Sequence, residues 1–318
     1  MDTDVDLLSE LLAPLRLHGV FHSHWTARAP WGVAGAHENG ALLHFVREGS
    51  CVVELPGTAP LTLRTGDLAL FPHGTGHRLG DRPGRPTIPL SQLLPQRPPD
   101  TMRVVTIDGA GAVTTMLCGG LRYDRAAAAP LYRALPPVLV LDAATVAAEP
   151  LLAGTLRELA AEWDHIRAGG RLVALRAFEL VFVLALRVAL DYSAQNTPLV
   201  RAMRHPAISR VLFAIHTRYA EPWTLESLAA EAGMSRSAFA ATFRRLVGEA
   251  PMRHLMNRRL QEAARLLGET SLTHDAIAAR VGYGSSTGLH LAFRNWSGQT
   301  PGEYRRARLA SARTEVSA

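Results

Sequence analysis

Residues 235–247 and 285–297 each combine an N-terminal Ser with Arg and hydroxyl side chains spaced as on the outer face of a helix. In the first stretch, Phe239 and Phe243 recur at helical spacing and predict a buried face. The positions left outside are Ser235, Arg236, Ser237, Ala240, Ala241, Arg244 and Arg245. Guanidinium and hydroxyl groups donate hydrogen bonds to phosphate oxygens and base edges. We therefore predict that this face contacts nucleic acid.

The second stretch repeats the first at an offset of 50 residues, so that Ser285 aligns with Ser235 and Phe293 with Phe243. Its surface candidates are Ser285, Ser286, Thr287, His290, Leu291 and Arg294. Two copies of one pattern predict two recognition helices, 235–247 and 285–297, with the same role.

The residues around each stretch predict the elements that position it. A Gly that can supply the positive φ of a tight turn precedes each capping Ser, Gly233 in one copy and Gly282 in the other. Helix, Gly turn and Ser-capped helix is the pattern of a helix-turn-helix unit. Between the copies, Pro251–Leu267 predicts a helix of about 17 residues, near 25 Å long. Such a helix would hold the two recognition helices for successive major grooves.

The charge of the chain is unevenly distributed. Residues 201–318 hold 17 Arg against 9 Asp or Glu, whereas the remainder is close to neutral. A basic segment of this kind is typical of a polyanion-binding module. The alternative is a helical bundle with no nucleic-acid role, but the repeat, the Gly turns and the charge together favour DNA binding.

The C-terminal part closely resembles the DNA-binding domain of AraC/XylS-type transcriptional regulators, on motifs such as Pro222-Trp-Thr-Leu-Glu-Ser-Leu-Ala and Pro301-Gly-Glu-Tyr-Arg. The resemblance covers about residues 202–308. It implies a bacterial regulator that binds double-stranded promoter DNA, often as a dimer, and commonly activates RNA polymerase. The DNA-facing positions that it implies are Ser237, Ala240, Ala241, Thr287, Gly288 and Leu291.

The second copy departs from the family pattern. It reads His290-Leu-Ala-Phe where Ser-Arg-Ala-Phe is usual, so that Leu291 replaces an Arg often used on DNA. A Leu side chain contacts thymine methyl groups but makes no hydrogen bond to a base. We therefore expect less direct base readout from the second helix, with phosphate contacts from Arg236, Arg244, Arg245 and Arg294 supplying much of the affinity.

From about residue 19 to 125 the chain changes to short apolar runs separated by Gly, Pro and Asp, which predicts an all-β sandwich or barrel. The expected strands are 42–47, 51–55, 61–64, 68–71, 103–107, 113–118 and 138–142. Arg82–Pro99, with six Pro, predicts a surface loop. The fold class is therefore α+β, with a β-rich front part and an all-α back part.

The spacing Gly66-x5-Pro72-x-Gly74-x2-His77 resembles the second motif of the cupin barrel. The first cupin motif is degraded, because Leu42 stands at its Glu position and only His37 remains of its His pair. Over about residues 5–190 the chain is similar to the cupin-type sensor found in one AraC-like subgroup.

Histidines and a thiol in this part suggest ligand chemistry. Strand alternation puts His44 on one face with Leu42, and the cupin match directs His77 inward. With Cys118 they could hold zinc or another divalent metal, joined by His22, His24 or His37. The alternatives are ordinary barrel histidines beside a small buried Cys, and a thiol redox sensor using Cys51 or Cys118.

Residues 146–167 and 171–192 predict two helices, the second with a wide apolar face that a neighbour or a second subunit must cover. We expect a homodimer through helices 146–192. The expected domains are a sensor (1–142), a helical linker (143–200), a DNA-binding domain (201–310) and a disordered tail (311–318). Charges interrupt Leu172–Leu190, which argues against a membrane span.

Two Cys and an acidic N-terminus without signal-peptide features predict a reduced, cytoplasmic chain. Together the patterns predict a transcriptional regulator that responds to an effector or a metal and is not an enzyme, with no catalytic residues. The alternatives are a cupin enzyme with a DNA-targeting domain and a constitutive DNA-binding protein whose inert barrel only dimerises.

Overall fold

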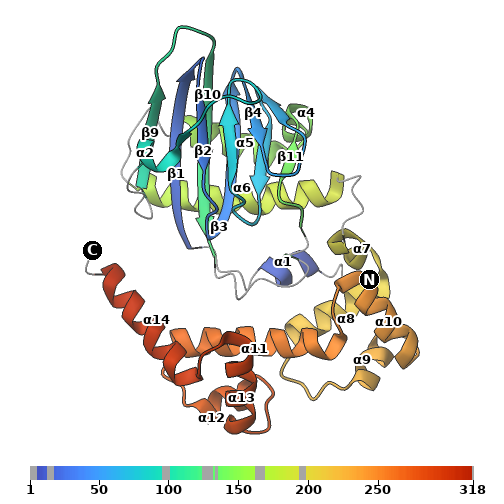
Figure 1. Ribbon diagram of the computed structural model, residues 1–318. Helices are drawn as coiled ribbons and strands as arrows, with labels where there is room; N and C mark the ends of the chain where they lie inside the picture. The colour runs from blue at the N-terminus through green and yellow to red at the C-terminus, as the bar shows by residue number, and fades with distance from the viewer. Residues whose placement is uncertain are drawn as a thin grey trace. The chain divides into compact units, whose positions relative to one another are not determined.

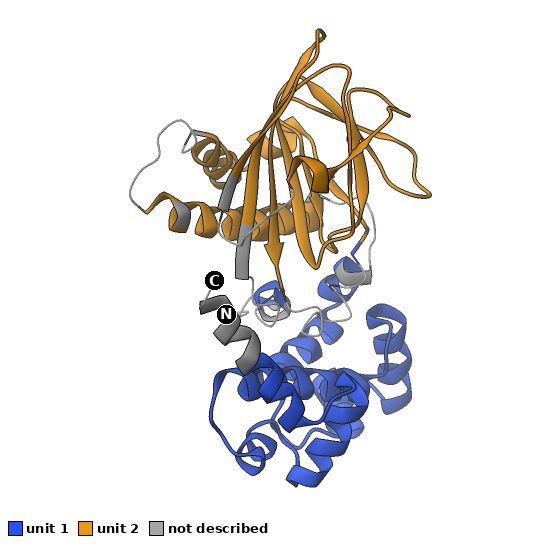
Figure 2. Ribbon diagram, turned by 60° about the vertical axis from the view of Figure 1, so that its left-hand side comes forward, with its two compact units in different colours: residues 1–15, 126–135, 196–318 blue, residues 16–125, 136–195 orange. Residues whose placement is uncertain are grey.

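The computed structural model describes residues 6–12, 18–94, 101–123, 132, 135–161, 169–192 and 198–316. It forms two compact units (Figures 1 and 2). Unit 1 comprises residues 1–15, 126–135 and 196–318, and unit 2 comprises residues 16–125 and 136–195. This division differs from the expected boundaries at 142 and 200, since α1 (Leu7–Leu12) packs on α8 (Pro206–Thr217) in unit 1.

Unit 2 is built on two sheets that face each other. Their strand orders are β11-β6-β3-β10-β1-β9 and β5-β4-β7-β2-β8. The strands are β1 (His18–Arg28), β2 (Gly32–Gly35), β3 (Gly40–Glu48), β4 (Ser50–Glu54), β5 (Leu61–Arg64), β6 (Leu68–Phe71), β7 (His77–Gly80), β8 (Ile88–Pro89), β9 (Thr101–Ile107), β10 (Val113–Arg122) and β11 (Leu139–Leu141). Each of the seven expected strands is present, with its ends moved by up to four residues.

Alternation along the strands separates the two faces of the larger sheet. Leu42, Val46, Met116 and Cys118 belong to the core cluster between the sheets, together with Trp25. The residues that alternate with them, such as Leu43, Phe45 and Leu117, point to the opposite face. The expected loop 82–99 is more structured than its Pro content predicts, because it contains β8 and the single turn α2 (Leu90–Leu93); residues 95–99 lie outside the described part.

Three helices follow the strands: α4 (Ala143–Ala147), α5 (Pro150–Ala161) and α6 (Gly170–Tyr192). The expected helix 146–167 is therefore divided, since α5 begins afresh at Pro150, whose ring and missing N–H suit the first turn of a helix. Its expected end, 162–167, lies outside the described residues. α6 covers the outer face of the larger sheet, where Phe178 packs on β1 and β10 (Figure 1).

Unit 1 is helical after α1. Its helices are α7 (Pro198–Arg204), α8, α9 (Leu225–Glu231), α10 (Arg236–Val247), α11 (Pro251–Glu269), α12 (His274–Arg280), α13 (Ser286–Ser297) and α14 (Pro301–Val316). The expected disordered tail, 311–318, differs from the structure, in which α14 continues to Val316 through residues such as Ala and Arg that favour helix. α11 is the expected connecting helix and is two residues longer than predicted.

Candidate nucleic-acid interface and barrel pocket

The first recognition helix, α10, is capped at both ends, and its N-terminal cap is the one that the sequence predicts. The Ser235 hydroxyl accepts a hydrogen bond from the Ala238 N–H, and Gly248 ends the helix with a φ of 88°. Gly233 has a φ of 65° in the preceding turn. The rings of Phe239 and Phe243 are fully buried and meet edge to face, with centroids 5.6 Å apart. These contacts leave the opposite face of α10 at the surface.

The predicted DNA-facing residues of α10 lie on that surface. Those exposed are Ser235, Arg236, Ser237, Ala241, Arg244 and Arg245, while Ala240 is half-buried. Arg236 is already engaged, since its Nη1 lies 2.7 Å from Glu226 Oε1 on the preceding helix. Sequence reasoning missed this ion pair, because the spacing of ten residues between Glu226 and Arg236 crosses the turn.

The second recognition helix, α13, has the same construction. Ser285 caps it through the Gly288 N–H at 3.1 Å, Gly298 ends it with a φ of 77°, and Phe293 is fully buried. Of its candidates, Ser285, Thr287, Leu291 and Arg294 are exposed, and Ser286 and His290 are half-buried. Leu291 is 59% exposed, so an apolar side chain occupies the outer face of this helix.

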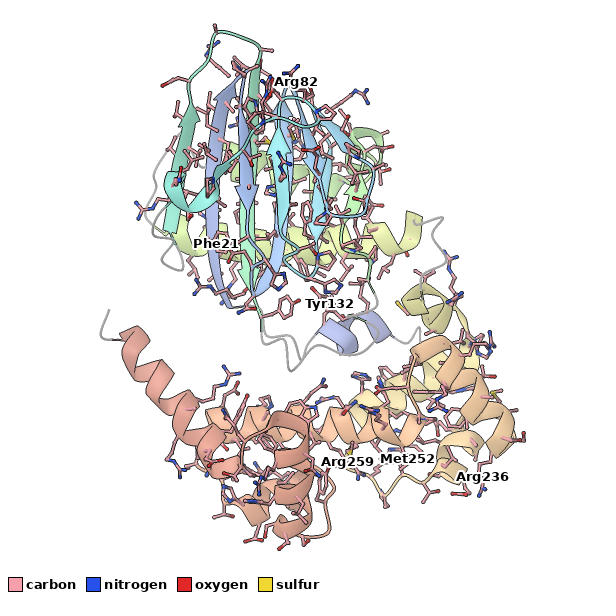
Figure 3. The ribbon with its side chains drawn as sticks, in the orientation of Figure 1. Phe21, Arg82, Tyr132, Arg236, Met252 and Arg259 are labelled. Atoms are coloured by element: carbon pink, nitrogen blue, oxygen red, sulfur yellow. The ribbon has the colours of Figure 1, made fainter. Side chains whose placement is uncertain are left out.

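Some basic side chains of unit 1 hold its loops rather than offering a charge to DNA. Arg259 on α11 donates to the carbonyls of Tyr219 and Glu221, each at 2.7 Å. Arg305 on α14 likewise donates to the carbonyls of Leu267 and Leu272. Figure 3 labels Arg259 and also Arg236, which pairs with Glu226. The net charge of the segment therefore overstates the charge available to a polyanion.

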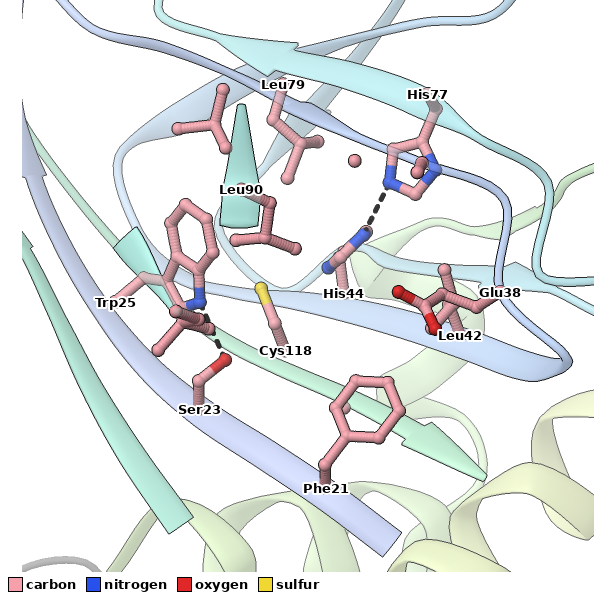
Figure 4. A pocket seen from close by; sticks show the side chains of 15 residues that line it. Phe21, Ser23, Trp25, Glu38, Leu42, His44, His77, Leu79, Leu90 and Cys118 are labelled. Atoms are coloured by element: carbon pink, nitrogen blue, oxygen red, sulfur yellow. Dashed lines mark hydrogen bonds between the residues drawn. The ribbon is translucent and has the colours of Figure 1, made fainter. Parts of the chain in front are cut away.

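A small pocket of about 50 Å³ lies between the two sheets of unit 2 (Figure 4). Its lining is mostly apolar and includes Phe21, Trp25, Leu42, Leu79, Leu90 and Leu94. The polar groups in its wall come from Ser23, Glu38, His44, His77 and Cys118. Ser23, Cys118 and His44 are register partners on the adjacent strands β1, β10 and β3, and so form one row across the sheet.

His44 and His77 meet in this pocket. Their Nε2 atoms are 2.7 Å apart, and His77 Nδ1 lies 2.7 Å from the Thr75 carbonyl oxygen. Burial holds the pKa of both imidazoles below its usual value, and the neighbouring His77 lowers the pKa of His44 further. Both rings are therefore neutral at pH 7.

The other histidines proposed for this site lie elsewhere. His22 and His24 alternate with the pocket residues of β1 and face the opposite side of the sheet, where the His22 ring packs 5.2 Å from Phe178 of α6. His37 lies after β2, in a different depression that Asn39 and Arg122 also line. Sequence reasoning offered His22 and His24 as further ligands, because the sequence of β1 does not indicate which of its faces turns toward the pocket.

The pocket does not fit a bound metal. Two imidazole nitrogens on one tetrahedral zinc stand about 3.3 Å apart, whereas His44 and His77 are at hydrogen-bonding distance. Leu42 occupies the position of the cupin carboxylate ligand. Among the residues described, no three His, Cys, Asp or Glu side chains are grouped so as to hold a metal ion.

The two thiols are buried and protonated. Burial raises the pKa of Cys51 to about 12, with a smaller contribution from the charge of Asp67. Burial also raises the pKa of Cys118 well above its usual range. The thiolate is the form that reacts with oxidants. These surroundings suit packing rather than the redox chemistry considered from sequence.

Comparison with known proteins finds a family match for the N-terminal part of the chain and another for the C-terminal part. A family model described as Cupin matches residues 6–191, and one described as Helix-turn-helix domain matches residues 228–307. The HTH-type transcriptional regulator AlkR of Acinetobacter baylyi is 27% identical over 95% of this chain and 99% of its own length. A putative AraC-like transcription regulator of Streptomyces lividans is 28% identical over 95% of this chain and 98% of its own length.

Among solved structures, the DNA-binding domain of AdpA in complex with a target DNA is 37% identical, covering 33% of this chain and 95% of that domain, with a TM-score of 0.32. Within the described residues, no helix is long and apolar enough to cross a membrane. The chain belongs to the AraC-type regulators with an N-terminal cupin domain, and it is a DNA-binding transcription regulator.

Proposed function

We propose that this regulator binds promoter DNA with the outer faces of α10 and α13 and responds to a small effector bound between the sheets of unit 2. The observation that carries the first part is the pair of Ser-capped helices with equivalent buried anchors, Phe243 and Phe293. Arg244, Arg245 and Arg294 are the exposed guanidinium groups that would contact phosphates.

The wall of the pocket suggests how an effector would act. Gly119 of β10 lines the pocket, and a Cβ placed on it would lie 2.2 Å from Phe178 Cε1 of α6. The backbone of one residue thus separates the pocket from the helix. Because Gly119 and Phe178 are packed closely together, a ligand that displaces β10 would also shift α6.

The exposed face of α5 and α6 is the proposed dimer interface. Four apolar side chains there are well exposed: Leu151, Leu172, Val173 and Leu180, at 58%, 59%, 55% and 38%. A face of this kind is unusual on a monomer surface. A dimer through these helices would couple effector binding to the spacing of two DNA-binding units, and contact with RNA polymerase would follow at the promoter in the cytoplasm.

We also infer that the pocket binds rather than catalyses. Its two imidazoles are neutral and hydrogen-bonded to each other, and its thiol is protonated. These groups offer neither a charged acid nor an activated nucleophile.

A genomic footprint of the purified full-length chain tests the proposed function. We expect protected sites upstream of genes, with two contacts one helical turn apart for each bound chain. Substituting both Arg244 and Arg294 by Ala should abolish protection, while the same change at Arg259 should lower stability instead. Protection that survives the double substitution would refute the proposed interface.

A further inference from the structure

The hydrogen bonds of the His44–His77 pair determine where each ring carries its proton. The Thr75 carbonyl only accepts, so His77 Nδ1 carries a hydrogen and donates to it. His77 is neutral, and its Nε2 is therefore a bare acceptor. His44 must then donate from its own Nε2 across the 2.7 Å contact. A neutral His44 consequently has no hydrogen on Nδ1.

The Nδ1 atom of His44 is a buried acceptor that lacks a donor. Among the described residues it makes no hydrogen bond, although the side chain is only 7% exposed. Figure 4 shows this nitrogen on the side of the ring away from His77, where Cys118 lines the pocket. Leaving such a group unpaired is costly. A ligand that donates a hydrogen bond would remove that cost.

The remaining wall specifies the body of the ligand. The side chains around the acceptor are aliphatic or aromatic, and the two imidazoles bring no charge. Glu38 is the one carboxylate in the lining and is half-buried. A lining of this kind favours an uncharged apolar body over an anion.

We propose that the pocket binds a small uncharged molecule with an apolar body and one hydroxyl group, which donates its hydrogen bond to Nδ1 of His44. This inference rests on the proposed role of the pocket as the effector site and adds the chemical class of the effector. The volume limits the ligand, since a cavity must offer about 10–15 Å³ to hold even one water. A pocket of about 50 Å³ therefore suits a ligand of only a few non-hydrogen atoms.

Three probes of four non-hydrogen atoms test this class in the full-length protein without DNA. 2-Propanol is a neutral donor, acetone is only an acceptor, and isopropylammonium is a cationic donor that Glu38 would attract. Methyl-resolved NMR titration reports binding through the Leu and Val methyl groups of the pocket. We expect saturable shifts with 2-propanol in the millimolar range and affinity for acetone at least tenfold weaker, the equivalent of one hydrogen bond or about 1.4 kcal/mol.

A variant and a spectroscopic readout isolate the acceptor. His44→Phe should remove the preference for 2-propanol over acetone, while His22→Phe, a matched change on the opposite face of the same sheet, should keep it. If His44→Phe does not fold, the ¹⁵N signal of His44 Nδ1 in the unaltered protein decides. It should be that of an unprotonated nitrogen and should move with 2-propanol but not with acetone.

Each remaining outcome overturns the inference. Equal affinity for acetone and 2-propanol would show that no hydrogen bond to Nδ1 of His44 contributes to binding. Preference for isopropylammonium would show that the pocket selects a cation. Binding of Zn²⁺ to His44 and His77 would show that the pocket is a metal site. If none of the probes binds while the protein still protects promoter DNA, the assigned ligand class is wrong and the proposed DNA-binding function stands.

Discussion

The salt dependence of DNA binding offers a direct test of which arginines face phosphates. Arg244 and Arg245 on α10 and Arg294 on α13 are exposed on the two recognition helices. Arg236 is exposed too, but its guanidinium lies 2.7 Å from the Glu226 carboxylate. The structure therefore predicts that Arg244→Ala and Arg236→Ala affect the salt slope differently.

The expected size follows from counterion release. Each phosphate contact contributes about 0.9 to the slope of log affinity against log salt concentration. Loss of Arg244 should lower the slope by about 0.9, and loss of all three should lower it by about 2.7. Between 50 and 200 mM salt, each lost contact thus reduces the salt-induced loss of affinity by about 3.5-fold.

Gel-shift titrations at four salt concentrations measure these slopes. Arg236→Ala should change the slope by less than half as much as Arg244→Ala, because Glu226 already neutralises Arg236. The matched change Glu226→Ala should raise the slope as Arg236 becomes available. Equal slopes for the Arg236 and Arg244 variants would refute the assignment of the ion pair, and unchanged slopes for all three arginines would refute the proposed face.

Three further predictions concern single positions. Burial lowers the pKa of His22 to about 4 in the folded state. Between pH 6.5 and pH 4 the unfolded state therefore binds a proton at this imidazole and the folded state does not. The contribution of His22 to the free energy of unfolding should fall by about 2 kcal/mol between pH 7 and pH 5, and urea titrations of His22→Phe should lack this component. Leu291→Arg should tighten DNA binding and change the footprint of the second helix; an unaltered footprint would mean that this position does not approach bases. Gly119→Ala should displace Phe178 and lower the melting temperature, and the added change Phe178→Leu should restore part of it.

The C-terminal elements were predictable because their determinants are local. Ser235 and Gly233 each act on the adjacent turn, and the structure has both in their expected roles. The ion pair of Arg236 was not predictable in this way, because it depends on how the turn folds α9 back toward α10.

The pocket was harder to predict, since it depends on which face of each strand turns inward. Alternation placed His44 on one face with Leu42 without saying which way that face turns, and the structure turns it toward the pocket. On β1 it left the choice open, and the structure turns Ser23 and Trp25 inward and His22 outward. Because α6 covers the outer face of the sheet, His22 is buried there just as Trp25 is buried on the inner face. A strand buried on both faces lacks the alternation of apolar and polar residues that would show which face turns inward.

The chemistry of the recognition helices bears on how this protein selects a promoter. The proposed DNA-facing positions are Ser237, Ala240 and Ala241 on α10, and on α13 they include the apolar Leu291. Such side chains make few hydrogen bonds to bases, whereas bidentate base contacts require Arg, Asn or Gln. In the proposed function the exposed arginines would contact phosphates, and such contacts hold a protein in register without specifying sequence. Discrimination between promoters would then depend strongly on thymine methyl contacts and on how easily a sequence bends to meet two helices joined by α11. Substitutions at uncontacted base pairs between the two half-sites should therefore change affinity as much as substitutions beneath α13.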